Sequence, residues 1–278
     1  MTALPLTAPR PGLLDRMLTD APALTRLGLL IGLALIPLLA AQAIDPRMLD
    51  GVGIWTKPIK FHLALSIYLL TLAAFARWLP PGLMRRRWYR AYETCVVIAI
   101  LGELIWIGGA AALGTTSHFN VATPVMAAIY GLMGLFAVSL TSLSLVHGIA
   151  IMRNRATGLP PVLRLGIGLG LILTFGLTVV VAGYMSQTDG HLVGIPSDPA
   201  RTLWLMGWSR EVGDLRVAHF LATHAMHAIP LAALLAWLTL PPRAANVATL
   251  AAAVGFVALV GLSFRQALLG RPFLPWLG

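Results

Sequence analysis

Seven long apolar stretches fill the chain between residues 24 and 269, and most of the connections between them are short. A helix needs about 20 consecutive apolar residues to cross the hydrocarbon core of a bilayer. A backbone in lipid must satisfy its own hydrogen bonds, and these stretches lack the period-two alternation of barrel strands, so each favours an α-helix. The sequence therefore predicts an all-α integral membrane protein, a bundle of about seven transmembrane helices.

The predicted spans cover residues 24–43, 58–79, 93–114, 122–152, 162–186, 215–240 and 247–269. Only 11% of the residues are charged, and no stretch outside the spans could bury a soluble core, so we expect one transmembrane domain, 24–270. An N-terminal segment, 1–23, precedes it. The one long loop, 187–213, carries Trp204 and Trp208 and is interpreted as a lid or an interfacial segment.

Local signals mark several helix boundaries. Thr123 and Asp214 are predicted to cap the helices that follow them, because their side-chain oxygens can accept from the first free backbone N–H groups. Paired prolines at 80–81, 160–161 and 241–242 are predicted to stop helices. Pro230 is predicted to kink the helix over 215–240 and to free a backbone carbonyl near Met226.

Positive charges predict the orientation. Cytoplasmic loops carry an excess of Lys and Arg, and the basic residues gather on one side in the N-terminal segment and in the second, fourth and sixth loops: Arg10, Arg16, Arg26, Arg85, Arg86, Arg87, Arg90, Arg153, Arg155, Arg164 and Arg243. The N-terminus is therefore expected to be cytoplasmic and the C-terminus extracytoplasmic. The net charge of +10 is strung along loops and span ends, so we expect the lipid bilayer as a partner and no nucleic acid.

Glu103 lies at the midpoint of the span 93–114. A carboxylate there costs several kcal/mol unless it is protonated, paired or in contact with water, so an ionisable residue at this depth indicates function. The alternative is a protonated Glu that hydrogen-bonds a neighbouring helix and only stabilises the bundle. Counting inward from the span ends places Glu103 at a depth similar to that of His227, and we expect both to take part in any catalysis or proton transfer.

Histidines gather near the predicted extracytoplasmic side. His219, His224 and His227 can share one face of a straight helix over 215–240. His118 lies at the same outer side, in the tight loop between the spans 93–114 and 122–152. Neutral imidazole is the commonest protein ligand of transition metals. We therefore predict these four as metal ligands, for haem b or for zinc, copper or iron. The alternative is that they make interhelical hydrogen bonds, and His147, near the cytoplasmic end of its helix, is interpreted as an interfacial residue.

A group of cations is predicted at the same outer side. Lys57 and Lys60, the only lysines in the chain, lie there with Arg216, and together they could bind an anionic group such as a phosphate or a haem propionate. Each could instead extend to lipid headgroups. The span 247–269 contains no lysine, which excludes a retinal Schiff base. The single cysteine, Cys95, excludes an internal disulfide and a cysteine-rich zinc site.

Three segments carry a resemblance: 55–61 (WTKPIKF), 117–120 (SHFN) and 213–220 (GDLRVAHF). They resemble a family of uncharacterised bacterial polytopic membrane proteins. The resemblance implies a shared seven-helix fold and a location in the bacterial cytoplasmic (inner) membrane, and it implies no activity.

Four functions fit these features. The favoured one is a metal or haem protein that acts near the extracytoplasmic face, in electron transfer or in oxidation of a lipid-phase substrate, with Glu103 as a proton carrier or further ligand. A zinc-dependent hydrolase would use Glu103 as general base. A proton-coupled transporter would relay protons between Glu103 and His227, although no inverted repeat is visible. A structural or accessory subunit of a larger membrane complex would need no such site, so whether the chain is an enzyme stays open.

Overall fold

The computed structural model describes residues 12–49, 51–198, 200–203 and 206–275; Arg10 and Trp204 lie outside this range. The described chain contains, in order, α1 (Leu13–Asp20), α2 (Pro22–Leu33), α3 (Leu35–Ile44), β1 (Met48–Leu49), β2 (Val52–Gly53), α4 (Thr56–Phe75), η1 (Ala76–Trp78), η2 (Leu83–Arg85), α5 (Arg87–Leu113), α6 (Pro124–Arg153), α7 (Pro161–Met185), β3 (Leu192–Val193), β4 (Gly213–Asp214), α8 (Leu215–Thr223), α9 (Ala225–Thr239) and α10 (Pro242–Leu268).

The described residues form six helices that are long and apolar enough to cross a membrane, or seven if the bent pair α8 and α9 is one span. The chain is thus mostly helical and has the character of a multi-pass membrane protein. The first of these helices combines α2 and α3. Helices α5 and α10 begin at Arg87 and Pro242, earlier than predicted, because the arginines and small residues that flank the apolar stretches are also helical.

The predicted caps are present. The side chain of Thr123 accepts a hydrogen bond from the Met126 N–H at the start of α6, and that of Asp214 accepts from the Arg216 N–H at the start of α8. Pro161 and Pro242 are the first residues of α7 and α10, where a proline's missing N–H leaves no hydrogen bond unmade. These prolines therefore begin helices as well as separating them.

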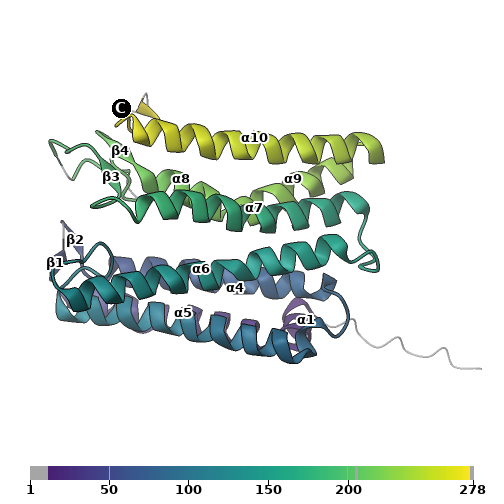
Figure 1. Cartoon of the computed structure of the whole chain (residues 1–278), viewed down its shortest axis with the longest axis horizontal. Coiled ribbons are helices and arrows are strands. Elements are labelled where there is room, and N and C mark those ends of the chain that lie inside the picture. The colour runs from purple at the N-terminus through teal and green to yellow at the C-terminus, as the bar shows by residue number, and fades with distance from the viewer. Residues whose placement is uncertain (1–11, 50, 199, 204–205, 276–278) are drawn as a thin grey trace, which may run out of the picture.

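The helices form two layers (Figure 1). In that view α7, α8, α9 and α10 form the upper layer, and α4, α5 and α6 lie in the lower one, with α1 at one end. Extensive packing of α6 against α7 joins the layers. We call the end of the bundle that carries β1 to β4 the strand end and the opposite end, where α1 lies, the α1 end. β1 pairs with β2 and β3 with β4, both antiparallel.

The contacts of α7 depend on glycines. A Cβ added to Gly168 would lie 2.0 Å from Met152 of α6, and one added to Gly148 of α6 would lie 2.9 Å from the Gly168 carbonyl oxygen. On the other side of α7, a Cβ on Gly170 would lie 2.8 Å from Pro230 of α9. Small residues let helix backbones approach closely in membranes, where dispersion contacts replace the hydrophobic effect. Glycines therefore hold α7 between α6 and α9.

The bend in the sixth span was predicted at the wrong residue. The axes of α8 and α9 differ by 51°, and the break falls at His224, whereas α9 continues through Pro230. The Phe220 carbonyl oxygen accepts from the Thr223 hydroxyl at 2.8 Å and lies 2.7 Å from His224 Nδ1. Side chains that bond to local carbonyls in this way compete with the helical ladder, so the chain breaks six residues before the proline.

Candidate functional site at the strand end

Glu103 of α5 is the most unusual side chain of the bundle interior. It is 2% exposed, and neither of its carboxylate oxygens has a hydrogen-bond partner among the described residues. The ammonium group of Lys57, at the start of α4, is close enough to interact with it electrostatically. Leaving a buried polar group without a partner is costly. The surroundings of Glu103 therefore suit a group that gains and loses a proton.

His118 approaches the same region from the connection between α5 and α6. The indole N–H of Trp106 donates to the Ser117 carbonyl oxygen at 2.9 Å, which ties this connection to α5. The His118 ring lies 5.6 Å from the ring of Phe61 and 6.1 Å from that of Tyr130. Burial, together with the nearby Lys57 and His219, lowers the pKa of His118 to about 3. The imidazole is therefore neutral at ordinary pH.

The residue after His118 has a strained backbone. Phe119 has a φ of 59°, in the left-handed region that bulky residues rarely adopt. Strain of this kind costs about 1–3 kcal/mol and gathers at ligand-binding and switching sites. The Asn120 side chain holds the turn by donating to the Thr115 hydroxyl and to the Thr116 carbonyl oxygen. The loop therefore fixes His118 in place at some cost in stability.

Electrostatic interactions link four residues from α4, α5, the α5–α6 connection and α8, and we call them the strand-end cluster: Lys57, Glu103, His118 and His219. His219 Nδ1 is buried and has no partner within the described part of the chain. All four were predicted as site residues: Lys57 as a cation and His118 and His219 as histidine ligands at the outer side, and Glu103 as an acid at mid-membrane depth. Their convergence around Lys57 was not predicted.

His224 and His227 lie apart from this cluster. The His224 ring stacks on that of Phe220 at 3.9 Å, and His227 Nε2 is 3.1 Å from the Thr71 hydroxyl of α4. Lys57 and Thr71 are 14 residues apart on α4, which is about 21 Å along the helix axis. Lys57, with which Glu103 interacts electrostatically, and Thr71, beside His227, therefore lie at different levels of α4, and the depth match between Glu103 and His227 stays a prediction.

The four predicted histidine ligands do not form a metal-binding group. Among residues 12–49, 51–198, 200–203 and 206–275, no three His, Cys, Asp or Glu side chains could hold one ion. The break at His224 explains part of this result, because it changes the helical phase between His219 and His227 and removes their common face. The rings of His224 and His227 are 5.5 Å apart, so these two remain neighbours.

Lys60 and Arg216, predicted to bind an anionic group, both bond to the backbone of the long loop. The Lys60 ammonium donates to the Met206 carbonyl oxygen at 3.0 Å, and the Arg216 guanidinium donates to the Gly207 carbonyl oxygen at 2.6 Å. Arg216 also forms an ion pair with the buried Asp214 at 2.6 Å. The loop after β3 is thus bound to the starts of α4 and α8 at the strand end, beside the cluster.

A second polar group lies toward the α1 end, and the sequence interpretation missed it. His147 is fully buried, and the Tyr89 hydroxyl lies 2.6 Å from its Nε2, so the interpretation of His147 as an interfacial residue is wrong. The Tyr92 hydroxyl contacts the Ser142 hydroxyl at 2.6 Å, and the Tyr68 hydroxyl donates to the Leu140 carbonyl oxygen. Tyrosines at the start of one span and a histidine near the end of the next were the available signal.

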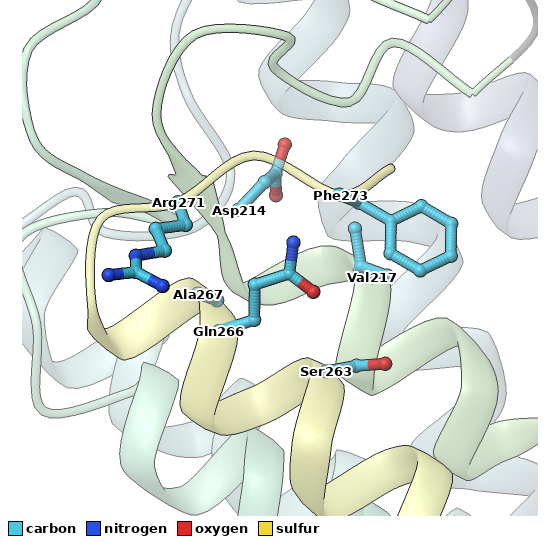
Figure 2. Close-up of a pocket in the computed structure, with 7 residues that line it drawn as sticks. All are labelled: Asp214, Val217, Ser263, Gln266, Ala267, Arg271 and Phe273. Atoms are coloured by element: carbon cyan, nitrogen blue, oxygen red, sulfur yellow. The ribbon is translucent and has the colours of Figure 1, made fainter. Parts of the chain in front are cut away.

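Two hollows lie outside these groups. One is a narrow depression at the strand end with no room for a water molecule (Figure 2), where Asp214 and Val217 meet Gln266 and Phe273. Two of its polar side chains are occupied, since Asp214 pairs with Arg216 and the Gln266 amide donates to the Pro272 carbonyl oxygen. The other, of about 240 Å³, is lined at the α1 end by Met152, Pro161, Arg164, Leu165 and Asn246. Neither contains residues of the strand-end cluster.

Comparison with known proteins found no match for the chain among protein-family models, curated proteins or solved structures. The family resemblance seen in the sequence therefore gains no support beyond its general class, a protein with several apolar helices. Any functional conclusion rests on the side chains and their geometry.

Proposed function

We propose that this chain is a multi-pass membrane transporter that moves a solute together with a proton, and that Glu103 carries the proton. The observation that supports this most is the state of Glu103, buried at 2% exposure with both carboxylate oxygens unpartnered in the described chain. Ionisable residues inside transmembrane helices commonly mark proton relays and substrate pathways. Protonation removes the cost of the buried charge, and Lys57 offsets part of that cost when the proton leaves.

The broken sixth span supports the same function. Helices α8 and α9 meet at 51° around His224, and the two together are long and apolar enough to form one membrane span. Transporters commonly place their sites at discontinuous helices, where chain ends and free polar groups face the site. His219 of α8 belongs to the strand-end cluster, and His227 of α9 lies nearer the α1 end, on Thr71. A change in the bend would therefore alter the spacing of two titratable groups.

The other functions have less support. A metal-dependent oxidation or a zinc-dependent hydrolysis needs a converging set of ligands, and the described residues contain no such group of three. A haem held by two histidines would need fewer ligands, yet His224 is already stacked on Phe220 and held by its carbonyl. A structural subunit would not need an unpartnered buried acid, because each such group lowers stability.

We place the protein in the bacterial cytoplasmic membrane with the strand end extracytoplasmic. The arginines of the second, fourth and sixth loops all lie at the α1 end, which by the positive-inside rule faces the cytoplasm. The lipid bilayer is then the main partner, with further membrane subunits as candidates and no nucleic acid. The strand-end cluster would receive solute and proton from outside the cell.

The test is proton movement in reconstituted vesicles. Purified protein is placed in liposomes that contain a fluorescent pH indicator, and the membrane potential is clamped with valinomycin and equal potassium concentrations. Sugars, amino acids, inorganic cations and inorganic anions are added as separate groups. We expect one group to accelerate proton entry over empty liposomes, and we expect Glu103→Gln, which cannot release a proton, to abolish this entry. If no group accelerates proton entry, the proposal is wrong.

A further inference from the structure

The two lysines of α4 differ in what they contact. Lys60 donates to the Met206 carbonyl oxygen, whereas Lys57 forms no hydrogen bond or ion pair within the described part of the chain. Its ammonium group lies 5.9 Å from the centre of the Phe61 ring and interacts electrostatically with Glu103. Lys57 is also in the first turn of a 20-residue helix whose start has no side-chain cap. A cation and free backbone N–H groups are thus available at one point.

The charges around Lys57 are few. Glu103 of α5 and His118 of the α5–α6 connection interact with it electrostatically, and His219 of α8 interacts with His118. His118 adds no charge at ordinary pH, because its pKa is lowered to about 3. Lys60, Arg216 and Asp214 form a neighbouring group with its own ion pair. The charge of the cluster therefore depends mainly on Lys57 and Glu103.

The protonation state of Glu103 therefore sets the net charge of the Lys57–Glu103 pair. When Glu103 is ionised, it balances Lys57 and the pair is neutral. When Glu103 takes up a proton, Lys57 is left as an uncompensated positive charge in a largely buried site, which is unfavourable without an anion. Binding of the proton therefore raises the affinity for an anion, and by linkage the anion raises the affinity for the proton to the same extent.

On the basis of the proton-linked function proposed above, we propose that the solute is a small monovalent anion, held by Lys57 while Glu103 carries the proton. Neutral imidazoles suit this ligand because each can donate one N–H, and the buried Nδ1 of His219 has no partner among the described residues. The rings of Phe61 and Tyr130 beside His118 limit the space, which favours an anion of a few atoms. A cation would be repelled by Lys57 when the proton is bound.

Strong-acid anions provide a clean test, because they do not cross a bilayer as neutral acids. Liposomes loaded with potassium gluconate are diluted into potassium chloride, nitrate or methanesulfonate, with valinomycin to hold the membrane potential at zero. We expect the inward anion gradient to drive proton entry in the wild type. Lys57→Met should slow this entry by at least about tenfold, since hydrogen bonds to a charged group are among the strongest in proteins, and Lys57→Arg should keep part of it.

Two further variants separate the roles of the pair. Glu103→Gln should take up radioactive chloride without proton entry, because Lys57 remains uncompensated but no proton can be released. Arg201→Met removes a strand-end positive charge that is largely exposed and outside the cluster, and its rates should stay within about twofold of wild type, as for most surface substitutions. If Lys57→Met does not fold, the double variant Lys57→Met/Glu103→Leu removes both members together and should fold without anion-driven proton entry.

The two proposals fail in different ways. If a sugar, an amino acid or a cation drives proton entry while chloride, nitrate and methanesulfonate have no effect, the anion inference is wrong and the proton-linked function stands. Anion-driven entry that is unchanged in Lys57→Met also overturns the inference, because Lys57 would then not hold the anion. If no solute drives proton entry in the wild type, the proton-linked function itself fails, and this inference fails with it.

Discussion

At the level of single residues, Glu103 separates a functional from a structural interpretation of the bundle interior. A carboxylic acid that links helices must have a partner on another helix, and removing it leaves that partner unsatisfied. The described residues place no hydrogen-bond partner on either oxygen of Glu103. Burial of Glu103 without a partner therefore lowers the stability of the folded state, and natural proteins keep such groups where they serve a function.

We expect Glu103→Leu to change the free energy of unfolding by less than about 1 kcal/mol, because neither carboxylate oxygen has a hydrogen-bond partner among the described residues that the substitution would leave unsatisfied. Glu103→Gln, which keeps the shape of the neutral acid, should behave alike. The measurement is unfolding of the detergent-solubilised protein by intrinsic tryptophan fluorescence. A loss of about 1–3 kcal/mol in the Leu variant alone would identify Glu103 as a residue that stabilises the bundle through a hydrogen bond.

His118 makes stability depend on pH. Its pKa is lowered from 6.5 to about 3, chiefly by burial and then by the electrostatic interactions with Lys57 and His219. Between these values the unfolded chain binds a proton that the folded chain does not, so stability falls as the pH is lowered through this window. Above pH 6.5 the His118 imidazole is neutral in both the folded and the unfolded chain, so its contribution to the free energy of unfolding is fully present.

We therefore expect the wild type to be less stable at pH 5 than at pH 7.5, and His118→Asn to reduce that difference. Thermal unfolding at the two pH values measures the effect, and an unchanged difference in the variant would assign the pH dependence to other groups. Glu211 is not an alternative source near pH 5 to 7, because hydrogen bonds from Asp198 and Ser197 lower its pKa below the ordinary value of 4.5.

At the level of elements, contact between α6 and α7 joins the two layers, and it depends on the absence of a side chain. A Cβ on Gly148 would lie 2.9 Å from the Gly168 carbonyl oxygen and from the Leu171 and Ile172 side chains. The Gly168 carbonyl oxygen belongs to the backbone of α7, so it cannot rotate away from a new methyl group as a flexible side chain can. The helices would have to separate to accept even one methyl group.

Gly148→Ala should therefore destabilise the protein by about 1–3 kcal/mol. Gly176 of the same pair of helices is the matched control, since a Cβ there would meet no atom within 4 Å. Gly176→Ala should be neutral or slightly stabilising because Ala has the higher helix propensity. Denaturant titration in micelles compares the two variants, and equal effects would show that close approach at Gly148 is not what limits the packing.

At the level of the whole molecule, orientation in the membrane decides which compartment the strand-end cluster meets. We expect the strand end to face outward. Ile195 in the long loop is 95% exposed, and Pro81 at the α1 end is also exposed. After replacement of Cys95 by Ala, a membrane-impermeant maleimide should label Ile195→Cys in intact cells and Pro81→Cys only after permeabilisation. The reverse pattern would place the cluster on the cytoplasmic side and contradict the proposed direction of transport.

The sequence by itself determined the features that depend on local chemistry. Apolar runs of spanning length predicted the helices, because lipid leaves the backbone no other way to satisfy its hydrogen bonds. Thr123 and Asp214 were recognised as caps because a cap acts within its own first turn. The position of Lys57 at the end of the bundle that carries the strands followed in the same way from its place just before the predicted span 58–79. All of these depend on neighbours within a few residues.

Only the tertiary structure decided which side chains meet. Glu103 interacts electrostatically with Lys57, and His147 is buried against Tyr89 rather than placed at an interface. The position of a residue along its span predicts its approximate depth in the membrane. Whether two residues of different spans touch depends on how the helices are arranged and on how far the side chains extend. The break at His224 was missed for a related reason: Pro230 is the stronger local signal, yet the competition for the Phe220 carbonyl oxygen bends the helix. Contacts between helices depend on packing that no local pattern encodes.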